Sequence, residues 1–330
     1  MADFSRYMVG AYATSPTLQV WDAEAETVYM RAMTEELGTI RGLELPFWGD
    51  GVHPHDSKLF LSLLADHWEF AITCLPGNMD GLVLNPHFGL ASNNEEGRQA
   101  ALTFYSKAAA AVRTLNDYFG RRSVVSVAVA TSPALSHPTA SSSADALYRS
   151  LETMSNYQWD GAKLAIEHCD SGRTKSKPVK GFLNIEEELQ TIEKLFAASA
   201  IEVGMTINWA RSVIEHRHPD GAAQHVRQAF EKGVLRGLIF SGTSAVESAY
   251  GQWTDLHLPV AREPGIVDFE PDSLMTAEAM RNCLFECDYR QLDYIGVKVL
   301  AVPRDSASCE RRVGINRDTL QILNQVIDGL

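Results

Sequence analysis

Short apolar runs alternate with longer amphipathic stretches along the whole chain. The apolar runs are five to nine residues long, and most are rich in Val, Ile, Leu or Ala, which is typical of buried parallel strands. We predict strands at residues 7–13, 42–46, 68–75, 123–131, 162–166, 202–208, 237–241 and 294–302. The stretches between them predict helices at residues 21–40, 57–66, 100–111, 185–200, 222–232, 275–290 and 318–330, with a further helix beginning near Ala146.

This alternation predicts the fold class. Parallel strands need crossover connections, usually helices, and about eight strand-helix units close a sheet into a barrel. No shift in composition marks a domain boundary. We therefore expect an α/β protein in which residues 1–330 form a single (β/α)8 TIM barrel.

The fifth predicted strand ends in a group of reactive side chains. Its apolar run, residues 162–166, is followed at once by Glu167, His168, Cys169 and Asp170. In these barrels the active site lies at the carboxyl ends of the strands, so a carboxylate at this point faces the site. Because side chains alternate along a strand, His168 is expected to point away from Glu167.

Composition and charge narrow the classes of function. The formal net charge of -13 argues against a surface for nucleic acid or anionic membranes, which needs clustered Lys and Arg. No apolar run approaches the roughly 20 residues that span a bilayer, and the start of the chain does not resemble a signal peptide, so we expect a cytoplasmic protein. The five cysteines lack paired spacing and predict neither a disulfide framework nor a Cys-rich zinc site.

Two segments carry a resemblance to a known family. They are GLASNNEEGRQAALTFYSKAAAAVRTLND, at residues 89–117, and LAIEHCDSG, at residues 164–172. Both resemble the xylose isomerase-like TIM-barrel superfamily, which includes sugar-phosphate isomerases, epimerases and a DNA-repair endonuclease branch. The resemblance implies a carbohydrate-like substrate, a role for Glu167 between metal and substrate, and homo-oligomers formed through the outer helices.

The chain departs from that family at the other metal-ligand positions. The family places Asp-x-x-His after strand six, His after strand seven and Glu after strand eight. Here Asn208 and Arg211 replace the first pair, Ser241 replaces the second His, and Lys298 replaces the last Glu. Charged Arg and Lys cannot ligate a cation, so we expect the inherited metal site to be lost.

The same substitutions suggest a different chemistry. Arg211 and Lys298 could hold an anionic group, or stabilise an enediolate formed when Glu167 removes a proton next to a carbonyl. These three residues are the predicted catalytic set, for a sugar, a sugar acid or a sugar phosphate. The alternative is a purely structural ion pair between Glu167 and the two cations.

Further polar residues lie at predicted strand ends or in the loops that follow. The predicted substrate-binding residues are Glu44, His53, His55, Asn78, His87, Asn208, Trp253, Asp255, His257 and Arg304. An indole face suits the C–H face of a sugar, which favours Trp253, although its long loop could equally form a lid or a subunit contact.

Three hypotheses are compatible with these residues. The first is an isomerase or epimerase that uses Glu167 as general base without a metal. The second is a metal-dependent lyase or isomerase in which Mn, Co or Zn is bound by Glu167 with His53, His55 or His257. The third is a non-catalytic barrel that binds a sugar or a partner protein. The acidic charge and the lost ligands disfavour the nuclease branch.

Overall fold

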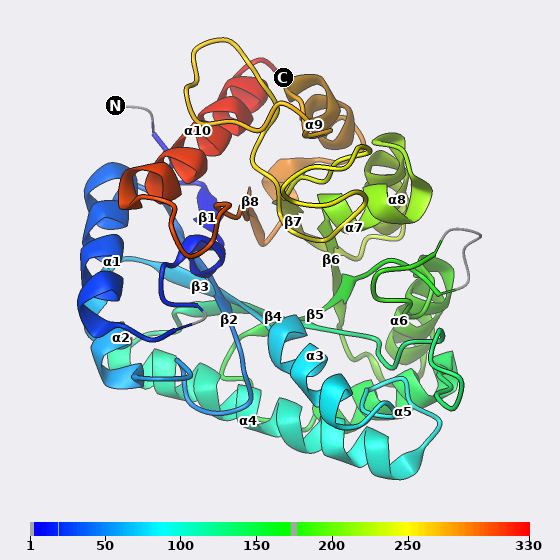
Figure 1. Ribbon diagram of the computed structural model, residues 1–330. Coiled ribbons are helices and arrows are strands. Elements are labelled where there is room, and N and C mark those ends of the chain that lie inside the picture. The colour runs from blue at the N-terminus through cyan, green and yellow to red at the C-terminus, as the bar shows by residue number, and fades with distance from the viewer. Residues whose placement is uncertain (1–2, 19, 173–176) are drawn as a thin grey trace.

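The computed structural model describes residues 3–18, 20–172 and 177–330. Eight parallel strands follow one another around a closed barrel in the order β1 to β8 (Figure 1). The strands are β1 Tyr7–Val9, β2 Gly42–Pro46, β3 Glu69–Thr73, β4 Val124–Val129, β5 Lys163–His168, β6 Gly204–Asn208, β7 Leu235–Phe240 and β8 Tyr294–Val297. The predicted (β/α)8 barrel is confirmed.

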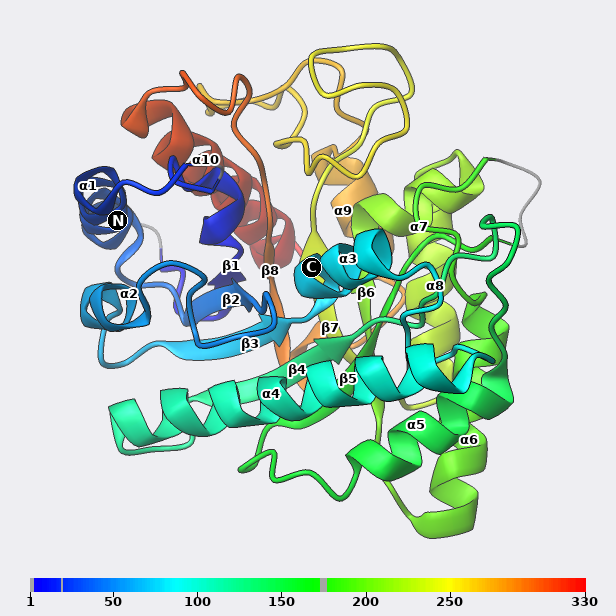
Figure 2. The ribbon, with the colours of Figure 1, turned by 60° about the horizontal axis from the view of Figure 1, so that its bottom comes forward.

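Helices surround the barrel, and most of them cover the outer faces of its strands. They are α1 Ala23–Leu37, α2 Ser57–Leu63, α3 Leu75–Leu84, α4 Glu95–Phe119, α5 Ala144–Met154, α6 Ile185–Ser199, α7 Trp209–His216, α8 Asp220–Glu231, α9 Ala277–Leu284 and α10 Cys309–Asp328. Figure 2 shows the long helix α4 running beneath the barrel strands toward α5. None of the helices in the described ranges is both long and apolar enough to cross a membrane.

Two helices lie where the sequence predicted loops. Helix α3 contains Pro76 and Gly77, which favoured a loop, but a proline in the first turn of a helix costs nothing there. Helix α7 begins at Trp209, directly after β6, in a stretch too short to show a helical pattern by itself. These two helices matter because α3 lies over the barrel and α7 carries Arg211.

Other boundaries also differ from the prediction. Strand β1 ends at Val9, and a 3-10 helix, Ala11–Thr14, occupies the rest of the predicted strand. Strand β8 stops at Val297, so Lys298 lies just beyond it. Helix α10 begins at Cys309, earlier than predicted, and α9 ends at Leu284, earlier than predicted.

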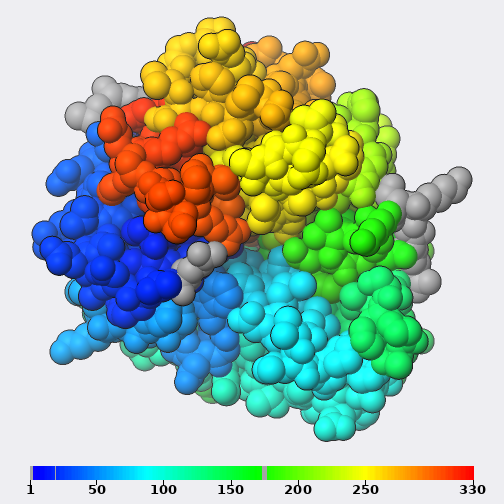
Figure 3. All heavy atoms as spheres, in the orientation of Figure 1, coloured from blue at the N-terminus to red at the C-terminus, as the bar shows by residue number. Residues whose placement is uncertain are grey.

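The carboxyl ends of the strands meet at one end of the barrel. Figures 1 and 3 show the segments that follow β1, β3, β7 and β8 gathering over this end. Within the segment between β7 and α9, an antiparallel bridge joins Gly242 to Leu258. Part of the basic loop predicted at residues 173–181 lies outside the described residues.

A buried ion-pair cluster at the carboxyl end of the barrel

Glu167 lies at the centre of the barrel end, near the end of β5, and is almost completely buried. Its carboxylate accepts a hydrogen bond of 2.6 Å from the Thr73 hydroxyl of β3 and another from the Arg211 guanidinium of α7. Lys298 Nζ lies 3.7 Å from the same carboxylate. Thr73 of β3, Arg211 of α7 and Lys298, just after β8, therefore all contact the Glu167 carboxylate.

Lys298 joins Glu167 to a second carboxylate. Its Nζ is 2.8 Å from Glu44 Oε2 of β2, and both side chains are buried. Neither Nζ nor Oε2 forms a well-aligned hydrogen bond in the described part of the chain. The Lys298 stem packs so closely on Gly10 that a Cβ at that position would lie 2.8 Å from Lys298 Cγ, which explains a glycine there.

Arg211 joins Glu167 to a third carboxylate. Arg211 Nε donates to Asp255 at 3.1 Å, and Lys180 Nζ lies 3.1 Å from the same oxygen. His257 Nδ1 is 3.4 Å from the other oxygen of Asp255 and 3.3 Å from the Ser241 hydroxyl. The long segment after β7 thus reaches the barrel centre through Asp255 and His257.

The charges in this cluster set the protonation states. Burial raises the pKa of Glu167, but Arg211 and Lys298 outweigh it and lower that pKa to about 2. Burial likewise opposes ionisation of Asp255, yet Arg211 and Lys180 bring its pKa below the usual value. Burial lowers the pKa of His257 to about 3, so this imidazole is neutral at pH 7.

Glu44 differs from the other two carboxylates. Burial raises its pKa above the usual value, and the attraction of Lys298 offsets this only in part. The pKa of Lys298 is itself raised, because the Glu44 and Glu167 charges overcome the effect of burial. Lys298 therefore stays protonated, and Glu44 is more basic than the Glu167 and Asp255 carboxylates.

A cavity of about 220 Å³ reaches the cluster at Glu44. It is lined by apolar side chains of α1, β2 and α2 together with a few polar groups, among them Tyr12, Glu26, Trp48, His53, His55 and Asp80. Glu26 is buried and accepts hydrogen bonds from Ser15 and Thr17. The mixture of an apolar wall and a few polar groups is typical of small-ligand sites.

The structure places several predicted residues in or beside this cluster or the cavity. Glu44, Asp255 and His257 touch the charged groups directly. Asn208 is buried at the end of β6, where its Oδ1 accepts from Ser241 at 2.9 Å. His53 and His55 line the cavity and pack against Trp21, at 4.9 and 5.3 Å between ring centroids.

The remaining predicted residues have other contacts. Asn78 is buried in α3 and accepts from Ser132 at 2.8 Å. His87 lies beyond α3, and its backbone N–H is bound to Asn85. Trp253 packs under the Arg217 guanidinium, 5.1 Å from its ring centroid. Arg304 lines a neighbouring cavity beside Ser15 and Leu18.

Sequence reasoning missed three residues of the site. Thr73 ends β3 and could have been found from its place at a strand end. Tyr12 lies beneath Lys298, with Nζ 5.9 Å from the ring centroid, in a stretch predicted as a strand, where the structure has a 3-10 helix. Lys180 belongs to the basic loop, where no pattern distinguishes it from its neighbours.

The barrel centre does not fit the divalent cation that the family resemblance implies. Two cationic side chains contact Glu167, where a metal would have to lie. Asn208 Oδ1 is engaged by Ser241. Such a donor set repels a cation rather than binding it.

Solved structures share the fold of this chain. The chain is a TIM barrel, and its fold is similar to that of L-ribulose 3-epimerase, with a TM-score of 0.60 and 14% identity over 98% of this chain and 95% of that chain. It is also similar to a xylose isomerase domain containing protein from Salmonella typhimurium LT2, with a TM-score of 0.55 and 11% identity over 98% of both chains.

The family is more specific. A family model matches residues 8–315, and the chain belongs to that family, which is described as a domain of unknown function, DUF4862. It is 31% identical over 325 residues to the uncharacterized protein STM3670 of Salmonella typhimurium strain LT2, covering 98% of this chain and 99% of the relative.

Proposed function

We propose that the protein is a carbohydrate isomerase or epimerase that moves a proton next to a substrate carbonyl. The observation that carries the proposal is the buried pair formed by Lys298 and Glu44, 2.8 Å apart, in which Glu44 lines the cavity. Both groups are buried, and within the described residues Lys298 Nζ and Glu44 Oε2 lack well-aligned hydrogen bonds. A sugar hydroxyl or carbonyl can therefore form hydrogen bonds with them. The names of the similar structures support the same class of reaction.

The proposed reaction needs one base and one fixed positive charge. A carboxylate takes the proton from the carbon next to the carbonyl, and the electron pair moves onto the carbonyl oxygen to form an enediolate. Lys298 stabilises that oxygen. Return of the proton to the former carbonyl carbon, with transfer of the adjacent hydroxyl proton to the enediolate oxygen, gives the isomer. Epimerisation instead needs a second acid that returns a proton to the opposite face of the original carbon.

Two carboxylates can act as the base. Glu167 is the residue predicted from the sequence, and its low pKa makes it a firmly ionised but weak base that also holds Arg211. Glu44 lines the cavity and has a raised pKa, which makes it a stronger base than Glu167. The two assignments predict different variants to be inactive.

The test is solvent exchange. The protein is incubated with a panel of ketoses and aldoses in D2O, and deuterium at carbon next to the carbonyl is followed by proton NMR. Loss of the base should slow exchange by about 10²–10⁴-fold, in Glu44→Gln if Glu44 acts and in Glu167→Gln if Glu167 acts. Glu231→Gln, at the exposed end of α8, is the control.

Two results would contradict the proposal. One is exchange that persists unchanged in both variants while circular dichroism shows them folded. The other is no exchange with any sugar of the panel, which would favour a binding barrel whose ion pairs are structural.

A further inference from the structure

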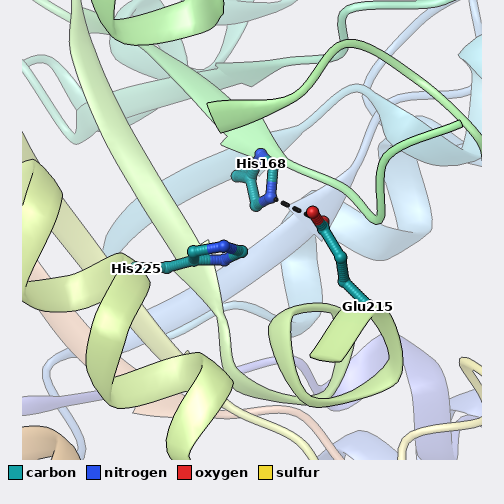
Figure 4. Close-up of side chains that lie close together, drawn as sticks. All are labelled: His168, Glu215 and His225. Carbon is teal, nitrogen blue, oxygen red and sulfur yellow. Dashed lines mark hydrogen bonds and ion pairs between the residues drawn. The ribbon is translucent and has the colours of Figure 1, made fainter. Parts of the chain in front are cut away.

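A second polar cluster lies outside the barrel, on the reverse side of β5. His168, at the end of β5, points away from Glu167 toward α7 and α8. Figure 4 shows it facing Glu215 of α7 and His225 of α8, and its Nε2 is 3.2 Å from the Glu215 carboxylate. One ligand atom from each of the three residues lies within 4.8 Å of the other two.

Each of these histidines is held on one ring nitrogen by a group outside the cluster. His168 Nδ1 lies 2.7 Å from Glu188, a fully buried carboxylate that also accepts from Thr131. His225 Nδ1 lies 2.9 Å from the Ser212 hydroxyl. Histidines that bind metals are oriented in this way by a second partner, which leaves the other nitrogen for the ion.

A fourth donor closes the cluster on the solvent side. His216 Nε2 lies 3.1 Å from His225 Nε2, so two imidazole nitrogens face each other. An open depression of about 350 Å³ borders Glu215, His216 and His225. His216 itself is exposed, so an ion could reach the cluster from solvent.

We propose that this cluster is a transition-metal site, with zinc as the ion that three imidazoles and one carboxylate suit best. His168, Glu215 and His225 are the ligands, and His216, which lies beside His225, has to turn toward them to supply the fourth. The side chains have to close from their present spacing to metal-ligand distances of about 2.0–2.2 Å. The site is separate from the barrel centre, whose cationic side chains exclude a metal.

The position of the site gives the metal a structural role. Helix α7 carries Arg211 to Glu167 and, one turn later, Glu215 to the metal. The neighbouring residues Glu167 and His168 face the two clusters from opposite sides of β5. A bound ion therefore ties α7 and α8 to β5 and fixes the helix that supplies Arg211.

The experiment measures zinc binding directly. Chelator-treated protein is titrated with zinc by calorimetry, and the metal content after dialysis is measured by mass spectrometry. We expect about one zinc ion per chain, together with a zinc-dependent rise in melting temperature. Glu215→Gln and His225→Ala should each weaken binding by about 10–100-fold or more. His218→Ala, an exposed histidine in the next turn, should bind zinc like the wild type.

Other outcomes overturn the proposal. Protein that retains no zinc would leave an ion-pair cluster of His168 with Glu188 and Glu215. Zinc binding that survives Glu215→Gln and His225→Ala but is lost in Glu167→Gln would place the metal in the barrel. Glu215→Gln is nearly isosteric and partly exposed, so it keeps the test valid if His225→Ala does not fold.

Discussion

At the scale of single residues, two neighbours on β5 illustrate how one strand serves two sites. Glu167 points into the barrel, where it contacts Thr73, Arg211 and Lys298. His168 points outward and contacts Glu188. Both side chains are buried, so each needs partners of opposite charge to offset the loss of water. The alternation of side chains along a strand is what separates the two clusters.

The lowered pKa of Glu167 predicts an acid-dependent loss of stability. Its folded pKa of about 2 lies below the ordinary value of 4.5, so its contribution is complete above pH 4.5 and is lost as the pH falls toward 2. Asp255 acts with the same sign. Glu44 acts with the opposite sign, because its folded pKa is raised.

We expect the free energy of unfolding in urea to fall by on the order of 1–3 kcal/mol more in the wild type than in Glu167→Gln when the pH is lowered from 6 to 3. Glu231→Gln should follow the wild type. Parallel curves for the wild type and Glu167→Gln would show that Glu167 is not held ionised by its neighbours.

At the scale of elements, the segment between β7 and α9 completes the cluster. It places Asp255 against Arg211 and Lys180, and it is further anchored by the Tyr250 hydroxyl, which donates to the Leu300 carbonyl at 2.8 Å. Several of these contacts depend on one carboxylate. The segment should therefore loosen when that charge is removed.

Asp255→Asn removes the ion-pair partner of Lys180 and leaves Arg211 with Glu167 alone, in a buried place. We expect it to cost about 3–5 kcal/mol of stability and to speed amide hydrogen exchange across residues 244–258, measured by mass spectrometry. Glu247→Gln, an exposed residue of the same segment, is the matched control. Unchanged exchange in Asp255→Asn would mean that the remaining anchors hold the segment alone.

The strands and the barrel were predictable because buried parallel strands are short, apolar and bounded by turns. β2 was predicted with its correct bounds, and the others to within a few residues at each end, except for the C-terminal ends of β1 and β8. Helices α3 and α7 were not predicted, since both begin within two residues of a strand end and are too short for a periodic pattern. The sequence therefore did not predict that Arg211 contacts Glu167 from a helix.

Strand ends also explain which site residues the sequence could identify. Glu44, Glu167 and Lys298 lie at the carboxyl ends of β2, β5 and β8, so the fold class alone brings them together. Lys180 comes from a loop whose path the sequence does not specify. The second polar cluster depends on how α7 and α8 pack against β5. No local sequence pattern predicts that Glu215 and His225 contact His168.

At the scale of the whole molecule, charge points to the class of substrate. The cluster holds three carboxylates, Glu44, Glu167 and Asp255, against three cations, Lys180, Arg211 and Lys298, so among the described residues of the cluster every cation has an anionic partner. The chain as a whole carries a net charge of -13. An anionic substrate would have to approach an acidic surface and displace one of these carboxylates from its cation.

We therefore expect a neutral sugar to be preferred over a sugar phosphate. A free ketohexose should act at a concentration at least about tenfold lower than its 6-phosphate, both in proton exchange in D2O and in raising the melting temperature of the protein. The reason is that burying an unpaired phosphate costs well over 1.4 kcal/mol, which corresponds to about tenfold in affinity. Sulfate serves as the control for a simple anion and should neither inhibit nor stabilise beyond its general salt effect. Tighter binding of the phosphate ester would show that Arg211 or Lys298 leaves its carboxylate to hold the substrate, and the charge balance of the unliganded cluster would then not determine specificity.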